Sequence, residues 1–151
     1  MGRVLPRPVV FEGDLCRSDL GLDTSDERWI GRHCRAVLHN AAKLTFYGTD
    51  RQREPWISNV EGTRHVLELC RRCGIRQFHH ISTAYVCGLR EGRILETELD
   101  VGQEMGNDYE RSKVEAEKLV RSARLEQPAT IYRPSIIVGD SQTGYSSTFH
   151  G

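Results

Sequence analysis

The alternation of short apolar runs with longer segments of helical periodicity most constrains the fold of this chain. Strands are expected at residues 9–11, 36–39, 77–82 and 129–132, followed by an apolar run at 136–139. Helical patterns cover residues 25–34, 55–72 and 107–124. Strands that alternate with helices in this way predict an α/β fold with a doubly wound parallel sheet and helices on both faces.

Local signals place the ends of these helices. Ser25 and Asp26 are expected to cap the first helix, which Gly31 weakens, and Gly74 is expected to end the second helix.

Composition favours one soluble domain spanning residues 1–151. Hydrophobic residues make up 38% of the 151-residue chain and charged residues 28%, which is typical of a globular protein. Lys and Arg number 21, as do Asp and Glu, so we expect no nucleic-acid partner. No apolar run reaches the roughly 18 residues of a membrane span. The five cysteines form no disulfide framework, which favours a reduced, cytoplasmic protein.

Neither the cysteines nor the histidines have the spacing of a metal site, and we expect no metal ion. Cys70 and Cys73 lie in a predicted helix without a second pair, so they are interpreted as surface or core thiols. His39, His79 and His80 adjoin predicted strands and are interpreted as packing or partly exposed residues.

Small and polar residues directly follow each predicted strand. Because parallel strands end at one edge of a sheet, these residues are expected to meet in a cofactor crevice there. They are Gly13-Asp14, Asn40-Ala41-Ala42, Ser82-Thr83 and Pro134-Ser135.

Thr83, Tyr109 and Lys113 form the sharpest candidate for catalysis. Tyr109 and Lys113 are four residues apart in a predicted helix and therefore share a face. A nearby ammonium group lowers a tyrosine pKa from about 10 toward the range useful for acid-base catalysis. With a hydroxyl from Thr83, these groups could protonate an oxygen while hydride moves between a nicotinamide and the adjacent carbon.

Several phrases around these residues resemble the extended short-chain dehydrogenases/reductases, whose fold is Rossmann-like. The chain is most similar to their thioester-reductase-like and fatty-acyl-CoA-reductase (male-sterility) branch over about residues 9–144. The phrases that carry the resemblance are FEGDLCRSDLGLD, VLHNAAKLTF, NVEGTRHVLELC, HHISTAYVCG, the Tyr109–Lys113 pair and YRPSIIVGDSQTG.

The resemblance implies roles for individual residues. Thr83, Tyr109 and Lys113 would be catalytic, and the last two would also contact the cofactor, for which NADP(H) is favoured over NAD(H). Asn59 would support the catalytic lysine. The other implied cofactor-binding residues are Asp14 and Leu15 at the adenine, Ala41, Ala42 and Lys43 along the ribose and phosphates, Ser82, and Pro134, Ser135 and Ile136 at the nicotinamide.

One element of the resemblance is missing from the sequence. A complete Rossmann domain opens with a strand and a glycine-rich turn that binds the pyrophosphate. No turn of that type is present, and the chain is expected to begin at the family's third strand and to end before the substrate-binding part. We therefore expect a single partial NAD(P)-binding Rossmann domain, lacking the first strands and the glycine-rich turn, whose own activity is open.

Three functions remain open from the sequence. The leading one is a reductase that transfers hydride to an acyl thioester, an aldehyde or a related carbonyl, with a small-molecule or carrier-bound acyl substrate. The second is a sugar-nucleotide epimerase or dehydratase on the same scaffold, and the third is an inactive remnant or binding module. The resemblance also implies a possible homodimer through the two long helices.

Overall fold

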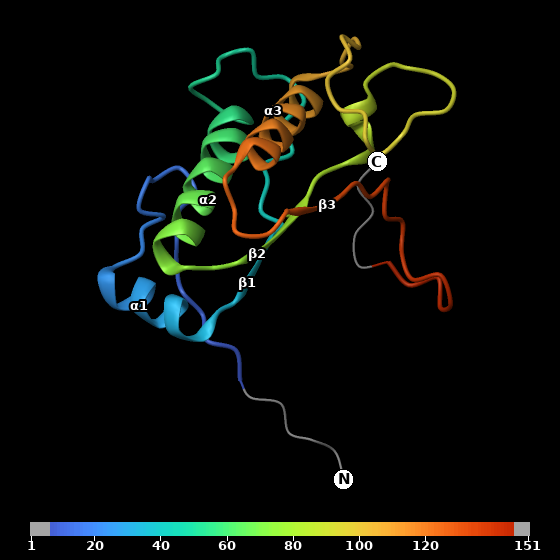
Figure 1. Ribbon diagram of the computed structural model, residues 1–151. Coiled ribbons are helices and arrows are strands. Elements are labelled where there is room, and N and C mark those ends of the chain that lie inside the picture. Colours follow the sequence, from blue (N-terminus) through green and yellow to red (C-terminus); the bar gives the residue numbers. More distant parts are fainter. Residues whose placement is uncertain (1–6, 147–151) are drawn as a thin grey trace.

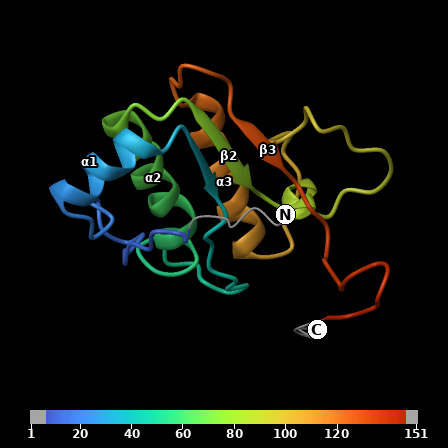
Figure 2. The ribbon, with the colours of Figure 1, turned by 90° about the horizontal axis from the view of Figure 1, so that it is seen from below.

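The computed structural model describes residues 7–146 and contains a parallel three-stranded sheet. The strands are β1 (Ala36–His39), β2 (Gln77–Ile81) and β3 (Thr130–Tyr132), in the order β1-β2-β3. The register pairs Ala36 with Gln77 and Ile81 with Tyr132. The predicted parallel α/β sheet is therefore confirmed (Figures 1 and 2).

The described residues contain three α-helices: α1 (Thr24–His33), α2 (Gly62–Cys73) and α3 (Asp108–Ser122). A π-helical turn, Ile57–Glu61, leads directly into α2, and a short 3₁₀ helix, Ala84–Cys87, follows β2. Helix α2 ends at Gly74, whose φ of 64° lies in the left-handed region, as the sequence predicts. In Figure 1, α2 and α3 lie side by side along the sheet.

The two faces of the sheet differ in burial. Phe78 and His80 of β2 are buried against the helices, where Phe78 joins a core with Val66 and Leu69 of α2. Leu38 on β1 and Tyr132 on β3 lie on the opposite face and are 63% and 43% exposed. The expectation of helices on both faces is therefore wrong for residues 7–146, in which the helices cover one face only.

The strand predicted at residues 9–11 does not form. Val9 and Val10 are exposed and belong to no sheet. In a doubly wound sheet of order 3-2-1-4, two other strands lie between the third strand and the fourth. The described residues contain no strand that would lie between this segment and β1, so its backbone has no neighbour to pair with. The apolar run at 136–139 also forms no strand, and Ile137 is 82% exposed.

Helix α1 is capped by a residue that the sequence analysis did not choose. The Asp23 carboxylate accepts hydrogen bonds from the Ser25 and Asp26 amides, and the Asp26 carboxylate accepts one from the Asp23 amide. The reason is that a cap must precede the first helical residue, and the helix begins at Thr24. Gly31 lets α1 approach α2, because a Cβ there would lie 3.3 Å from the Cys73 carbonyl oxygen.

None of the helices in residues 7–146 has both the length and the apolar character needed to span a membrane.

Candidate active site

Helix α3 carries both Tyr109 and Lys113, and Lys113 reaches the end of β2. Its first turn is fixed by a reciprocal cap, in which Asn107 Oδ1 accepts from the Glu110 amide and Asn107 Nδ2 donates to Glu110 Oε1. The Gly106 amide donates to Glu110 Oε2 at 2.8 Å. This cap holds the helix start, and therefore Tyr109, in one orientation.

The Lys113 ammonium reaches the sheet. Its Nζ donates to the Ile81 carbonyl oxygen at 2.7 Å, and the residue is only 3% exposed. Burial lowers the pKa of Lys113 to about 8, although the carboxylate of Glu117 acts in the opposite direction. Lys113 is therefore a cation at neutral pH, and it loses its proton when the pH rises slightly above neutral.

Tyr109 is half-buried, and its ring lies edge-on to Phe46 with the centroids 6.3 Å apart. Burial raises the pKa of Tyr109 in this structure. The sequence analysis expected Lys113 to lower that pKa. The structure differs because burial disfavours the charged phenolate.

Thr83 and Ser82 are both buried where β2 ends. Thr83 Oγ1 accepts a hydrogen bond from the Tyr85 amide and caps the 3₁₀ helix, whereas Ser82 Oγ is buried without a partner among the described residues. Pro134 lies beside them, because its carbonyl accepts from the Ala84 amide at 2.9 Å. The exits of β2 and β3 thus lie together, as predicted.

Asn59 joins the loop after β1 to helix α3. Its Oδ1 accepts from the Lys43 amide at 2.7 Å, and its Nδ2 donates to the Lys43 carbonyl and to Ser112 Oγ. Ser112 Oγ in turn donates to the Tyr109 carbonyl. The side chain is 2% exposed and lies in the π-helical turn, a feature often found at functional sites.

A second buried hydrogen bond extends this network to β1. Thr63 Oγ1 donates its only proton to the Asn59 carbonyl at 2.7 Å, so it must accept from His39 Nε2 at 3.0 Å. Burial, with a smaller contribution from the Lys113 charge, lowers the pKa of His39 to about 4. His39 is therefore neutral at physiological pH and carries its proton on Nε2.

His80 lies next to His39, with the ring centroids 5.4 Å apart. It is 1% exposed, and neither ring nitrogen has a partner among the described residues. Burial, followed by the charge of Lys113 and the influence of His39, lowers the pKa of His80 to about 3. His79 lies on the other face of the sheet, where it hydrogen-bonds the Tyr132 hydroxyl.

The remaining predicted cofactor residues lie on loops. Asp14, Ala41, Ala42 and Lys43 are exposed, Leu15 is half-buried against α2, and Ser135 and Ile136 are exposed beyond β3. Ile136 is 66% exposed, and its place at the nicotinamide stays a prediction.

Sequence reasoning missed a buried ion pair that supports the site. Arg133 bonds both carboxylate oxygens of Glu117, at 2.8 and 2.9 Å, and Glu117 is fully buried. Since Glu117 lies one turn after Lys113, this pair anchors α3 to the exit of β3. The four-residue spacing of Lys113 and Glu117 could have indicated that Glu117 lies on the same helix face as Lys113.

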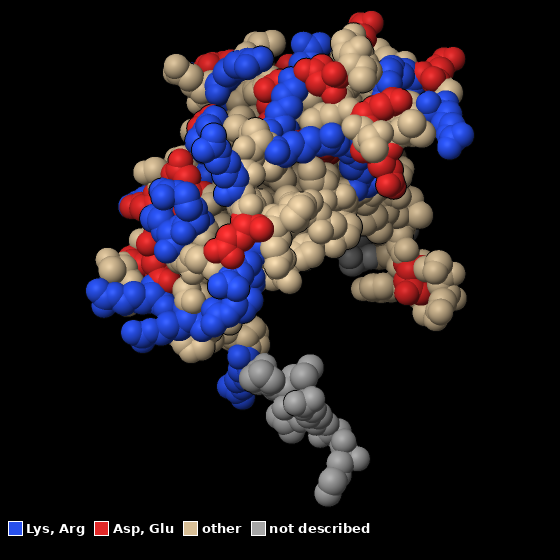
Figure 3. Space-filling model, viewed as in Figure 1, with Lys and Arg blue, Asp and Glu red and all other residues tan. Residues whose placement is uncertain are grey.

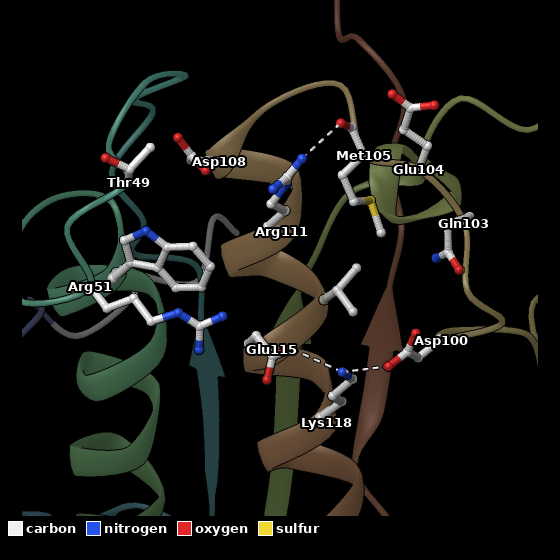
Figure 4. Close-up of a pocket in the computed structure, with 12 residues that line it drawn as sticks. Thr49, Arg51, Asp100, Gln103, Glu104, Met105, Asp108, Arg111, Glu115 and Lys118 are labelled. Atoms are coloured by element: carbon white, nitrogen blue, oxygen red, sulfur yellow. Dashed lines mark hydrogen bonds and ion pairs between the residues drawn. The ribbon is translucent and has the colours of Figure 1, made fainter.

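A groove of about 510 Å³ lies on the outward face of α3 and contains none of the predicted site residues (Figure 4). Lys118 on its wall pairs with Asp100 and Glu115, and Arg111 donates to the Met105 carbonyl. Lys118, Asp100 and Glu115 thus already pair with one another.

Comparison with known proteins shows the family of the chain. Residues 2–151 match the NAD-binding family described as male sterility protein. The chain belongs to this family. The Tyr109–Lys113 pair and the GDL phrase that suggested the resemblance therefore lie in a domain of the predicted type, and the prediction of an extended short-chain dehydrogenase/reductase is confirmed.

Individual relatives point the same way. The chain is 34% identical to the PKS-NRPS hybrid synthetase cheA of Chaetomium globosum over 155 residues, covering 89% of this chain and 3% of that protein. It is 33% identical to the alcohol-forming fatty acyl-CoA reductase of Simmondsia chinensis over 103 residues, covering 68% of this chain and 20% of that one.

Among solved structures, the chain resembles the terminal R domain from the myxalamid PKS-NRPS biosynthetic pathway. The TM-score is 0.73 at 33% identity, and the match covers 87% of this chain and 34% of that one. The chain thus spans only a minor part of each of these proteins.

The residues of this family member fit part of a nicotinamide cofactor. A buried lysine cation, a helix tyrosine and exposed small residues at Ala41 and Ala42 suit a ribose and a nicotinamide ring. Residues 1–151 contain no glycine-rich turn of the pyrophosphate-binding type. The fit therefore concerns the nicotinamide side and the loops along the cofactor, and not the pyrophosphate.

Proposed function

We propose that this chain supplies the catalytic residues of a reductase that uses NADPH to reduce an acyl thioester or the aldehyde derived from it. The observation that carries the proposal is the buried Lys113 ammonium, which lies on the same helix face as Tyr109 and is held against the Ile81 carbonyl at the end of β2, two residues before Thr83. Family membership supports the class of cofactor, and the names of the relatives support the class of substrate.

The chain's own residues divide the work as follows. When bound, the cofactor supplies the hydride that adds to the carbonyl carbon. Tyr109 gives its proton to the carbonyl oxygen as negative charge develops there, and Thr83 donates a hydrogen bond to the same oxygen. Lys113 favours the resulting tyrosinate through its charge. With a thioester, the hydroxyl formed then loses its proton as the carbon–sulfur bond breaks, which releases an aldehyde and a thiol.

The substrate is proposed to arrive on a carrier, either coenzyme A or a carrier domain. The motivation is that relatives covering most of this chain are named as PKS-NRPS synthetases and acyl-CoA reductases. NADPH is proposed as the preferred cofactor over NADH on the resemblance alone, and a parallel titration with both tests it.

The test is reduction of octanoyl-CoA by the purified chain, with NADPH oxidation followed by absorbance and the product identified by mass spectrometry. Tyr109→Phe should lower the rate by about 10²–10⁴-fold, the usual contribution of general acid catalysis. Tyr85→Phe, at an exposed tyrosine on the neighbouring 3₁₀ helix, is the matched control and should retain the rate.

Other outcomes separate the alternatives. Equal rates for Tyr109→Phe and Tyr85→Phe would contradict the proposed mechanism. Conversion of a nucleotide sugar without net NADPH consumption would favour the epimerase. A folded chain that binds NADPH and converts neither substrate would favour a binding module.

A further inference from the structure

The loop that carries Asp14 and Leu15 is closed by its own hydrogen bonds. The Asp14 amide donates to the Leu20 carbonyl at 2.8 Å, and the Asp14 carboxylate accepts from the Cys16 amide at 2.8 Å. Leu20 adopts a positive φ of 57° and is buried in the core. A Cβ at Gly13 would lie 2.8 Å from the Leu20 carbonyl oxygen, so only glycine allows this closure. The loop is therefore a compact unit, and its position relative to the sheet depends on its contacts with α2.

Helix α2 holds this unit at Leu15 by two contacts. A Cβ at Gly62 would lie 3.0 Å from Leu15 Cβ, and 3.5 Å from each of its methyl carbons. His65 Nδ1 lies 2.8 Å from the Leu15 carbonyl oxygen. Because a carbonyl oxygen can only accept, His65 Nδ1 is the donor. Gly62 leaves room for the Leu15 side chain against the helix, and the His65 hydrogen bond holds the Leu15 backbone.

The same stretch of helix also holds the loop after β1. Asn59 binds both backbone groups of Lys43, one helical turn before Gly62. The loop of Leu15 and the loop of Lys43 are both predicted to contact the cofactor. Both are held by residues 59–65, two successive turns of one continuous helical segment. In Figure 1 the loop of residues 13–22 lies beside the first turns of α2.

We infer that Gly62 and His65 are positioning residues that hold the Asp14–Leu15 turn in place for the adenine end of the cofactor. This inference rests on the proposed function. Neither residue contacts the reacting atoms, and both act through Leu15. Their loss should therefore weaken binding of the adenine half of the cofactor and leave the nicotinamide half unaffected.

Three variants on α2 separate these contacts from general effects on the helix. Gly62→Ala adds the carbon that meets Leu15. His65→Leu removes the donor, whereas His65→Asn has a similar size and places an amide Nδ2 where the ring Nδ1 lies. Arg64→Ala, on the exposed side of the same turn, is the matched control. Thermal melting of each variant establishes that it is folded.

The probes are 2′-phospho-ADP-ribose, for the adenine half, and reduced nicotinamide mononucleotide, for the other half, with dissociation constants measured by calorimetry. Gly62→Ala and His65→Leu should each raise the Kd of 2′-phospho-ADP-ribose about tenfold, the effect of losing one well-formed contact. His65→Asn should recover most of the loss, and Arg64→Ala should show none. The Kd of the nicotinamide mononucleotide should be the same for all variants.

The outcomes distinguish this inference from the proposed function. If the unaltered chain binds the adenine probe and folded Gly62→Ala and His65→Leu bind it equally well, the inference is wrong and the proposed function stands. If both probes weaken together, the two residues support the fold in general and the inference is also wrong. If the unaltered, folded chain binds neither probe, the proposed function itself is contradicted, and the adenine role of the turn with it.

Discussion

At the scale of single residues, the site contains buried groups whose pKa values differ from those in water. Lys113 carries the clearest consequence for activity, because burial lowers its pKa to about 8. It is charged below that pH and neutral above it. The tyrosinate that forms on Tyr109 during reduction therefore loses its nearby positive charge as the pH rises through about 8.

We predict that the reductase rate falls as the pH rises through about 8, and that Lys113→Arg moves this decline to higher pH. Arginine keeps its charge over this range, since its pKa is above about 12. The measurement is the pH profile of kcat with octanoyl-CoA for both proteins, each checked for folding by circular dichroism. The same alkaline limb in both proteins would show that Lys113 is not the group that titrates.

His80 has a cost in stability that does not depend on the proposed activity. Its pKa is lowered from 6.5 to about 3, so the unfolded chain binds a proton below pH 6.5 that the folded chain does not. Above pH 6.5 the titration of His80 takes nothing from the free energy of unfolding. As the pH falls from 6.5 toward the folded-state pKa of about 3, the free energy of unfolding decreases. The slope is about 1.4 kcal/mol per pH unit.

We predict that His80→Leu is at least as stable as the unaltered chain at pH 7, because neither ring nitrogen has a partner among the described residues. Between about pH 6 and 4 its free energy of unfolding should fall less steeply, by about 1.4 kcal/mol per pH unit. Urea unfolding at a series of pH values measures both quantities. An unchanged slope would mean that His80 is charged in the folded protein.

At the scale of elements, the site depends on how α2, α3 and the strand ends are joined. Asn59 makes three hydrogen bonds between the π-helical turn, the Lys43 backbone and Ser112. Replacing it leaves the backbone of Lys43 without these partners at a point where α2 and α3 meet.

We expect Asn59→Leu, which has a similar size, to cost about 2 kcal/mol of unfolding free energy, the usual penalty for unpaired polar groups. Ser112→Ala removes the acceptor of Asn59 Nδ2 and the donor to the Tyr109 carbonyl, leaves the Lys43 backbone paired, and should cost about half as much. Urea unfolding at neutral pH compares them. Asn59→Leu with undiminished stability would indicate that water replaces these bonds without loss.

The Glu117–Arg133 pair makes a second test at this scale. Arg133→Met leaves a fully buried carboxylate without its main partner and should cost about 3–5 kcal/mol. Adding Glu117→Leu to that variant should restore most of the loss, since the unpaired charge is then gone. A double variant as unstable as the single one would point to lost packing and not to the charge.

The sequence predicted these elements unevenly. The three strands that form, the left-handed end of α2 at Gly74 and the Asn107 start of α3 follow from periodicity and capping residues. The strand at residues 9–11 was predicted from its apolar run, but strand formation needs a neighbour, which no local pattern reveals. The network from His39 through Thr63 to Asn59 joins residues 24 positions apart and depends on tertiary structure.

At the scale of the whole molecule, helices cover one face of the sheet, and the other face is open in the described residues. The apolar side chains of Leu38 and Ile137 on the open side are 63% and 82% exposed. On the helical side, basic and acidic side chains are interspersed over α2 and α3 (Figure 3). The homodimer through these two helices stays a prediction.

The most direct test of the central claim, that this chain carries a nicotinamide-cofactor site around Lys113, is its melting temperature during titration with NADPH. A ligand that binds only the folded state raises that temperature. We predict a saturable rise, which Lys113→Met reduces because it removes the cation beside the proposed ribose position. A folded chain whose melting temperature does not change at any NADPH concentration would contradict the claim.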